Sequence, residues 1–516
     1  MRVASRFSCN GFDFRFTMAA RPIRLSRRAA LIGALAGIAS PVLPALAEPG
    51  AQRPRPRRHT MPADDMIEAA RLSGRVSFAV MDLADGSMME ERGGSIAQPP
   101  ASVAKAVTAL YALEALGPAH RFRTRIEATG PLRDGRVEGD LVLVGGGDPT
   151  LDADALGDLA IKLEEMGVRE IAGAFRTEGG ALPKIAAIDP ALPDEAAYNP
   201  PVSGLNLNFN RVHFGWRSEG GDYVVDMDAR ARRYRPRVQV ARMEVVDRRG
   251  PVYTYANSDG LDKWTVARSA LGAEGSRWLP VRQPEAYAAD AFRAIARVHG
   301  LTLPAQAAPV QSVRADAQRM VLADHVSEPL DAIVAGMLNY STNLTAEALG
   351  LAASEALGGA PGTLAESGAQ MADWSRRRFG LARAPVFADH SGLNDSARIS
   401  TAQMVQVLAR AAEEGALRPL LRDIVLRDSG GTPDPSSGVT IDAKTGTLNF
   451  VSTLAGYVTT AQGRELAFAV FVDDLAQRAT LDPGDPSRPP GGRTWLARSR
   501  TLHHRLITRW ARQADV

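Results

Sequence analysis

A serine and a lysine three positions apart, Ser102 and Lys105, are the residues of this chain best suited to chemistry. A neutral lysine can take the proton of a serine hydroxyl, which turns that serine into a nucleophile. Burial and nearby positive charge lower the pKa of a lysine toward the neutral form. The pair therefore predicts attack by Ser102 on a carbonyl group with Lys105 as the base. Taken alone, it also fits a helix-capping serine followed by a surface lysine.

Two further short motifs follow in the chain, Ser341-Thr342-Asn343 and Lys444-Thr445-Gly446. The hydroxyl of Ser341 can relay a proton, and the amide of Asn343 can hold a substrate backbone. Each motif alone also fits an ordinary feature, a helix-capping loop for the first and a polar edge strand for the second. The three motifs together, in this order, are far rarer than any one of them and indicate a single site.

The segment from Lys444 to Thr447 is predicted to be a strand. Alternation places Lys444 and Gly446 on one face and Thr445 and Thr447 on the other. The small Gly446 leaves room for a peptide to lie beside the strand as an additional one. Lys444 and the threonine hydroxyls can bind a terminal carboxylate, and the Thr447 N–H is a candidate second donor to an oxyanion.

Helices must position the first two motifs. Apolar spacing predicts a helix that begins at Ser102 and ends at Gly117-Pro118. Its N-terminus offers N–H groups and partial positive charge to the oxyanion that forms when a serine attacks a carbonyl. Ser341 and Asn343 lie between two helical stretches, residues 330–338 and 344–351, so both side chains can point into one cleft.

The chain between the first two motifs has a different pattern. Short strands separated by Gly-rich turns predict a mostly β insertion over residues 121–311. The predicted strands there are 123–128, 136–144, 212–216, 223–227 and 237–246. From about residue 315 the pattern becomes helical again, and later strands are predicted at 441–446, 452–459 and 465–472. Residues 61–120 and 312–516 are therefore predicted to form one domain that the insertion interrupts.

The N-terminal residues have the pattern of a targeting signal rather than that of a folded domain. A basic stretch, an apolar run and Ala45-Leu46-Ala47 predict an export signal over residues 1–47, cleaved near Ala47 and carried by the twin-arginine or the general route. Met18 is an alternative start. Residues 48–60 are proline-rich and polar, which predicts a linker. The single cysteine, Cys9, lies in the signal, so the mature chain has no disulfide, which fits a periplasmic protein.

Composition narrows the function classes. The formal net charge is +3, and no basic stripe alternates with aromatic residues, so nucleic-acid binding is not expected. The eight histidines form no spaced ligand motif, so neither a metal nor another cofactor is expected. A final helix over residues 494–511 has one apolar face. This face predicts packing on a sheet, or at most weak peripheral contact with a membrane.

With these motifs the chain resembles the class C low-molecular-mass penicillin-binding proteins, the D-alanyl-D-alanine carboxypeptidase/endopeptidase family. The long interval between Ser102 and Ser341 is typical of that family. Further local matches are residues 143–151, 389–393, 444–448 and 454–457. Departures from the family pattern are Val103-Ala104, Ala397 and the segment 420–439, and they leave substrate preference open.

The resemblance implies an α/β domain of the transpeptidase-like or β-lactamase-like class, with a sheet flanked by helices and a β-rich insertion. It implies cleavage of D-Ala-D-Ala ends or of cross-links in peptidoglycan stem peptides, and acylation by penicillin and other β-lactam antibiotics, without a cofactor. The roles that it implies are nucleophile for Ser102, base for Lys105, proton shuttle for Ser341, and substrate contacts for Asn343, Lys444, Thr445, Gly446 and Thr447. The alternatives are a serine β-lactamase and a catalytically silent peptidoglycan-binding module.

Overall fold

The structure is a computed structural model that describes residues 61–304, 319–428, 430–482 and 489–516. The predicted export signal and linker, residues 1–60, lie outside the described residues. Within the described ranges, none of the helices combines the length and the apolar character that crossing a bilayer requires.

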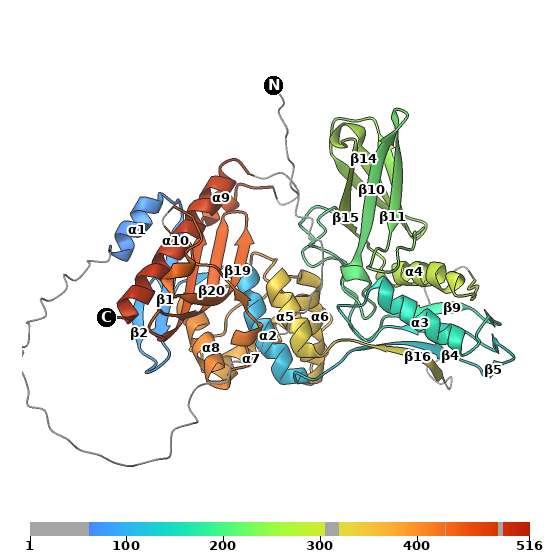
Figure 1. The fold of residues 1–516 in the computed structure, drawn as a ribbon, viewed down its shortest axis with the longest axis horizontal. Helices are drawn as coiled ribbons and strands as arrows, with labels where there is room; N and C mark the ends of the chain where they lie inside the picture. Colours follow the sequence, from blue (N-terminus) through green and yellow to red (C-terminus); the bar gives the residue numbers. More distant parts are fainter. Residues whose placement is uncertain (1–60, 305–318, 429, 483–488) are drawn as a thin grey trace, which may run out of the picture. The chain divides into compact units, whose positions relative to one another are not determined.

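A six-stranded antiparallel sheet, in the order β18-β19-β20-β21-β1-β2, forms the centre of the first region (Figure 1). Its strands are β1 (Arg75–Asp82), β2 (Met88–Arg92), β18 (Arg422–Asp423), β19 (Thr440–Leu448), β20 (Val451–Thr459) and β21 (Glu465–Asp473). β1 pairs along its whole length with β21, so a segment before the first motif joins a segment near the end of the chain. The sheet is therefore built from segments that are far apart in the sequence.

Both faces of the sheet are buried. On β21, Phe468, Val470 and Val472 pack on one side with α1 (Ala63–Ala70) and α10 (Gly492–Ala514). The alternate residues Ala467, Ala469 and Phe471 pack on the other side with the helices that carry the motifs. A strand that is covered on both faces is apolar throughout, which explains the unbroken apolar run of β21.

The apolar face of α10 lies against the sheet. Trp495, Leu502, Leu506 and Trp510 are all buried there, and the Trp510 indole N–H donates to Glu90 at 2.8 Å. The structure thus shows the predicted packing of this helix on the sheet.

Four helices make the layer that bears the motifs: α2 (Ala104–Leu116), α5 (Leu330–Tyr340), α6 (Asn343–Ala356) and α7 (Leu364–Phe379). α2 contacts the other three, and its residues from Ala104 to Ala112 are all buried. A helix surrounded on every side is apolar all round rather than amphipathic. α8 (Thr401–Glu414) completes the layer and packs on β1, β20 and β21.

The described residues between α2 and α5, the predicted insertion, hold four small sheets: β16-β4-β7-β9, β11-β10-β15, β12-β14-β13 and β5-β6-β8. Its strands are β4 (Arg123–Ala128), β5 (Leu132–Arg133), β6 (Arg136–Val137), β7 (Leu141–Val144), β8 (Glu170–Ile171), β9 (Phe175–Glu178), β10 (Arg211–Glu219), β11 (Asp222–Asp228), β12 (Ala241–Val246), β13 (Tyr253–Ser258), β14 (Leu261–Ala267), β15 (Glu274–Pro280) and β16 (Met320–Val326). Two helices, α3 (Ala153–Glu165) and α4 (Pro284–Val298), share one apolar core with these strands.

Two sequence predictions in this region are wrong. Residues 320–326 form strand β16, paired with β4, where a helical pattern was predicted from about residue 315. β4 therefore pairs with a strand that ends at Val326. The predicted strand 136–144 is two strands, because the chain bends at Glu138 and Gly139 between β6 and β7. Periodicity alone does not distinguish a helix from a strand in a short apolar run. The run at β16 forms a strand because it pairs with β4.

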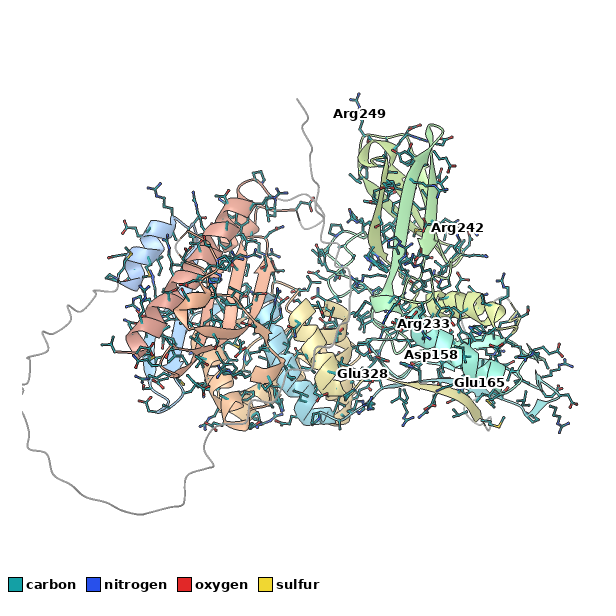
Figure 2. The ribbon with its side chains drawn as sticks, in the orientation of Figure 1. Asp158, Glu165, Arg233, Arg242, Arg249 and Glu328 are labelled. Carbon is teal, nitrogen blue, oxygen red and sulfur yellow. The ribbon has the colours of Figure 1, made fainter. Side chains whose placement is uncertain are left out.

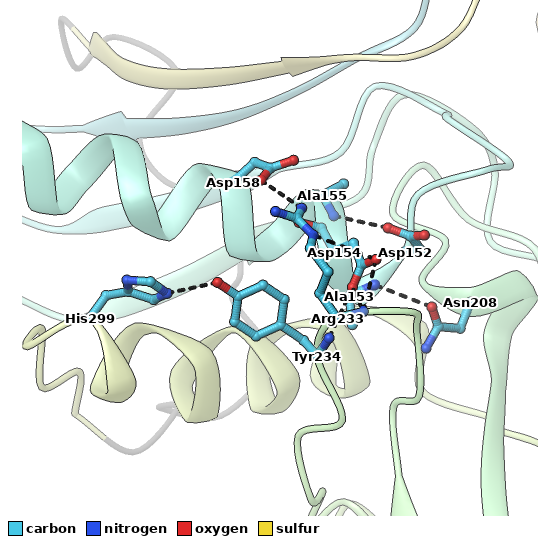
Figure 3. Close-up of polar contacts among 9 residues, drawn as sticks. All are labelled: Asp152, Ala153, Asp154, Ala155, Asp158, Asn208, Arg233, Tyr234 and His299. Carbon is cyan, nitrogen blue, oxygen red and sulfur yellow. Dashed lines mark hydrogen bonds and ion pairs between the residues drawn. The ribbon is translucent and has the colours of Figure 1, made fainter.

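Polar contacts tie the loop after β11 to the two helices (Figure 3). The Asp154 carboxylate, at the start of α3, accepts the backbone N–H groups of Arg233 and Tyr234 at 2.8 and 3.0 Å. The Arg233 guanidinium donates to Asp158 on the next turn, and the two residues lie together in Figure 2. The Tyr234 hydroxyl reaches His299, just past α4, at 2.9 Å. These contacts hold one end of the β10-β11 pair against the helices.

Candidate active site

Ser102 lies in a single 3₁₀ turn, Ala101–Val103, which runs directly into α2. The sequence predicted the helix to begin at Ser102, and the structure places one tighter turn there first. Ala101 has a φ of 45°, a left-handed conformation that alanine rarely adopts. Such strain costs roughly 1–3 kcal/mol and persists only where the surroundings enforce it. Here Thr453 on β20 donates to the Pro100 carbonyl oxygen at 2.7 Å and fixes the turn.

Two glycines allow this turn to sit close to its neighbours. A Cβ atom on Gly392 would lie 1.9 Å from the carbonyl oxygen of Ala101. A Cβ atom on Gly446 would lie 2.1 Å from the Thr453 hydroxyl oxygen and 2.7 Å from the Pro100 carbonyl oxygen. Both contacts are too short for any side chain, so glycine is required where the backbone approaches. Gly446 therefore lets the turn that carries Ser102 lie close to β19.

Lys105 is completely buried, and its amine contacts three oxygens. The Nζ atom lies 3.1 Å from Ser102 Oγ, 2.8 Å from Asn343 Oδ1 and 2.8 Å from the Ser391 carbonyl oxygen. The amide oxygen and the carbonyl oxygen can only accept, so they take two N–H bonds. A neutral amine then has its lone pair left for the hydroxyl proton of Ser102. The geometry suits proton transfer from Ser102 to Lys105.

The charge state of Lys105 is set mainly by burial. Loss of hydration lowers the pKa of Lys105 to about 8, and the nearby Asp389 and Glu347 oppose this change. A pKa near the working pH is the one best suited to a general base. Burial and nearby positive charge were the two expected ways to reach this state, and the lowering of the Lys105 pKa comes from burial.

Two buried carboxyl groups lie behind Lys105, and sequence analysis assigned neither a role. Glu347 accepts the backbone N–H groups of His390 and Ser391, both at 2.9 Å. Asp389 accepts those of Gly392 and Asn394, at 2.6 and 2.7 Å. Burial raises the pKa of Glu347 to about 8 and also raises the pKa of Asp389. Together they fix the 389–394 loop, which presents the Ser391 carbonyl to Lys105.

A sequence signal for Glu347 did exist. It is a single acid within an otherwise apolar stretch of α6, and such a residue is rarely buried unless it has partners.

Ser341 ends helix α5 with a φ of 59°, and its hydroxyl faces Lys444. Lys444 Nζ donates to Ser341 Oγ at 3.0 Å and to the Thr445 carbonyl oxygen at 2.7 Å. Burial is the largest cause that lowers the pKa of Lys444, followed by the charges of Lys105 and Arg422. The structure therefore brings Ser341 into contact with the third motif.

Asn343 links the first two motifs and reaches the inserted region. It is the first residue of α6, and its amide oxygen accepts from Lys105. Its amide nitrogen donates to the Tyr198 carbonyl oxygen at 2.9 Å. The amide nitrogen keeps a second N–H, which a substrate can accept while the contact with Tyr198 remains.

Strand β19 presents the third motif as alternation predicts. Lys444 and Gly446 are buried, whereas Thr445 and Thr447 are exposed. β20 pairs along the whole strand on one side, while β18 pairs only with Asp442 and Ala443 on the other. Within the described residues, the edge from Lys444 onward has no strand partner. It lies beside the turn that carries Ser102 and contacts that turn.

The geometry can be compared with known proteins. A sequence profile of the D-Ala-D-Ala carboxypeptidase 3 (S13) family matches residues 61–486. The chain belongs to this family. It is a low-molecular-mass penicillin-binding protein and a serine peptidase, so the resemblance drawn from the three motifs is confirmed.

Individual relatives agree with this family. The chain is 29% identical over 489 residues to a D-alanyl-D-alanine carboxypeptidase of Actinomadura sp. (strain R39), which covers 87% of this chain and 88% of the relative. It is 23% identical to the D-alanyl-D-alanine carboxypeptidase DacB of Haemophilus influenzae, over 79% of this chain and 87% of that one. The crystal structure of penicillin binding protein 4 from Haemophilus influenzae superimposes with a TM-score of 0.68 at 21% identity. That match covers 87% of this chain and 99% of the other and shows the mixed α/β fold.

Proposed function

We propose that this protein cleaves peptidoglycan stem peptides as a serine-type D-Ala-D-Ala carboxypeptidase/endopeptidase, through an ester on Ser102. The observation that carries the proposal is the Lys105 amine, which is held between two acceptors with its remaining contact on the Ser102 hydroxyl. β-Lactam antibiotics present a comparable carbonyl to the same serine and form the same kind of ester. Family membership supports both statements.

The reaction follows from the positions of the side chains. Ser102 Oγ attacks the carbonyl carbon of the penultimate D-Ala while its proton passes to Lys105 Nζ. The oxyanion is stabilised by backbone N–H groups, for which we propose those of Ser102 and Thr447. The peptide C–N bond then breaks, and the proton that Lys105 received passes through Ser341 to the leaving amine. Water hydrolyses the Ser102 ester and returns the enzyme to its starting state.

Lys444, Thr445 and Thr447 are proposed to bind the terminal carboxylate of the substrate, which lies along the open edge of β19 beside Gly446. Lys444 is buried beside a hydroxyl and a carbonyl, and its pKa is lowered. A carboxylate that arrives there supplies the missing opposite charge and raises the pKa of Lys444 again. This coupling favours substrates that end in a free carboxylate.

The β-lactamase alternative requires a carboxylate that holds a hydrolytic water. The two buried carboxyl groups nearest to Lys105 are Glu347 and Asp389, and each accepts two backbone N–H bonds. Their bonding to the 389–394 loop supports slow hydrolysis of a penicilloyl ester. It therefore favours the peptidase over the β-lactamase.

We also propose a role for each part of the chain. The region built on the six-stranded sheet, in which β1 pairs with β21, is the catalytic domain. The β-rich insertion shapes access to it through the contact of Tyr198 with Asn343. We also propose export to the periplasm through the predicted signal 1–47, with residues 48–60 as a linker. Peptidoglycan stem peptides are present in that compartment.

The test uses synthetic stem peptides and purified cross-linked dimers, with free D-Ala and dimer loss followed by mass spectrometry. The Ser102→Ala variant is compared with Ser396→Ala, which alters an exposed serine on the loop that follows Asp389. We expect turnover by the wild type and by Ser396→Ala, and none by Ser102→Ala. Release of D-Ala alone identifies a carboxypeptidase, and loss of dimers identifies an endopeptidase. Equal turnover by Ser102→Ala would refute the proposal.

A further inference from the structure

The inserted region contains a second cluster of chemically capable side chains, separate from the residues around Ser102. His213 lies on β10, and Asp226 and Asp228 lie on β11. One ligand atom from each of the three lies within 4.8 Å of the other two. In the antiparallel pairing His213 is directly opposite Asp228, and Asp226 is two residues farther along the same face. The strand register therefore brings the three side chains together.

A glycine makes room for the third member. Gly215 is the residue opposite Asp226, and a Cβ atom on Gly215 would lie 2.7 Å from Asp226 Oδ1. Any larger residue would displace the Asp226 carboxylate. Because residue 215 is a glycine, the Asp226 carboxylate can lie over β10 within reach of His213. Gly215 is therefore the residue that allows Asp226 to join the cluster.

The imidazole of His213 has an unsatisfied nitrogen that faces the cluster. The side chain is 9% exposed, and Nδ1 is 3.9 Å from Asp228 Oδ2. Among the described residues, Nδ1 has no hydrogen-bond partner although it is buried. Buried polar atoms are rarely left without a partner, so a ligand bound to Nδ1 would satisfy this nitrogen. Trp278 packs against the ring at a centroid distance of 5.2 Å and orients it.

The surroundings allow a small ion to enter. His213 and Asp226 line an open cavity of about 430 Å³, which Trp216 and Glu274 also line, while Asp228 lies behind them. A further carboxylate, Glu274, belongs to β15 on the other side of β10.

One cation already lies at the cluster. The Arg230 guanidinium donates to both oxygens of Asp228, at 2.8 and 3.2 Å, and is 3.9 Å from Asp226. It balances only one of the two carboxylates, and it leaves His213 Nδ1 unpaired. Its side chain is 34% exposed, so it can turn toward solvent when another cation enters.

We propose that His213, Asp226 and Asp228 bind one divalent transition-metal ion, best represented by Zn²⁺. Zn²⁺ accepts mixed imidazole and carboxylate ligands at about 2.0–2.2 Å, in sites of three protein ligands and a water. Mg²⁺ and Ca²⁺ prefer sets made only of oxygen, so an imidazole disfavours them. The ion would join β10 to β11 within the insertion and take no part in the attack by Ser102. This prediction reverses the expectation from sequence spacing that no metal site is present.

The test is isothermal titration of the untagged mature protein with Zn²⁺ after treatment with EDTA and dialysis. We expect one site per chain with a Kd in the micromolar range and no competition from millimolar Mg²⁺. His213→Ala and Asp226→Asn should each weaken binding at least tenfold. Asp222→Asn, which removes a carboxylate from the same strand outside the cluster, should leave the Kd unchanged.

Two more variants sharpen the test. Arg230→Gln removes the competing cation and should tighten Zn²⁺ binding, whereas Gly215→Ala should weaken it by displacing Asp226. Acylation by benzylpenicillin checks that each variant is folded, since no catalytic residue is altered. The proposal is overturned if the wild type binds no Zn²⁺ at 100 µM, or if His213→Ala and Gly215→Ala both bind it as tightly as the wild type.

Discussion

The rate of acylation by a β-lactam should depend on pH through Lys105. The pKa of this lysine is lowered to about 8 by burial, and only its neutral form can accept the proton of Ser102. The neutral fraction is then about one-tenth at pH 7 and about nine-tenths at pH 9. We therefore expect the second-order rate constant of acylation to rise roughly tenfold between these values and to level off above pH 9.

An ordinary lysine gives a different curve. With a pKa of about 10.4, the neutral fraction would rise almost a hundredfold between pH 7 and 9 and would not level off. The assay is stopped-flow acylation by a chromogenic cephalosporin from pH 6 to 10, with circular dichroism at each pH to show that the fold is intact. A rate that is constant from pH 6 to 9, or one that rises tenfold per pH unit through pH 9.5, would refute the assignment of Lys105 as a base activated by burial.

Three substitutions test the parts around this base. Glu347→Gln puts an amide N–H₂ against one of the two backbone N–H donors, so it should cost about 1–3 kcal/mol and lower Tm by about 1–3 °C; an unchanged Tm in calorimetry would contradict the hydrogen bonds to the 389–394 loop. Gly446→Ala should slow acylation at least tenfold by displacing the turn that carries Ser102. Gly336→Ala adds a methyl group in open space and should leave the acylation rate unchanged. Equal rates for the two variants would contradict the close approach of that turn to Gly446. Lys444→Ala should raise KM for peptides with a free C-terminal carboxylate by about ten- to a hundredfold and change KM little for the C-terminal amides; an equal effect on both would argue against carboxylate binding.

Much of the fold could be predicted where local pattern and tertiary structure agree. The strand 123–128 and the final helix follow from spacing alone, because each has a clear face to bury. β16 could not be identified in this way, because the secondary structure of its short apolar run depends on pairing with β4. The 3₁₀ turn before α2 also escaped prediction, since it depends on Thr453 and on glycines far away in the chain.

The same division holds for the site. The motifs named the side chains, and the structure brings Ser102, Lys105 and Asn343 together through hydrogen bonds. Spacing could not show that the Ser391 carbonyl takes the third contact of the lysine, because backbone carbonyls leave no mark on the sequence. Nor could it show that Glu347 holds that carbonyl in place, since this depends on how α6 meets a loop more than 40 residues later.

The central claim is that Ser102 is a nucleophile whose ester is hydrolysed slowly. Its most direct test is the intact mass of the mature protein after incubation with benzylpenicillin, beside the Ser102→Ala variant. The account predicts one stable adduct with the mass of the whole drug on the wild type and none on the variant. A wild type that consumes the drug without an adduct would indicate a β-lactamase, and an adduct that persists in Ser102→Ala would place the nucleophile elsewhere; either result contradicts the account.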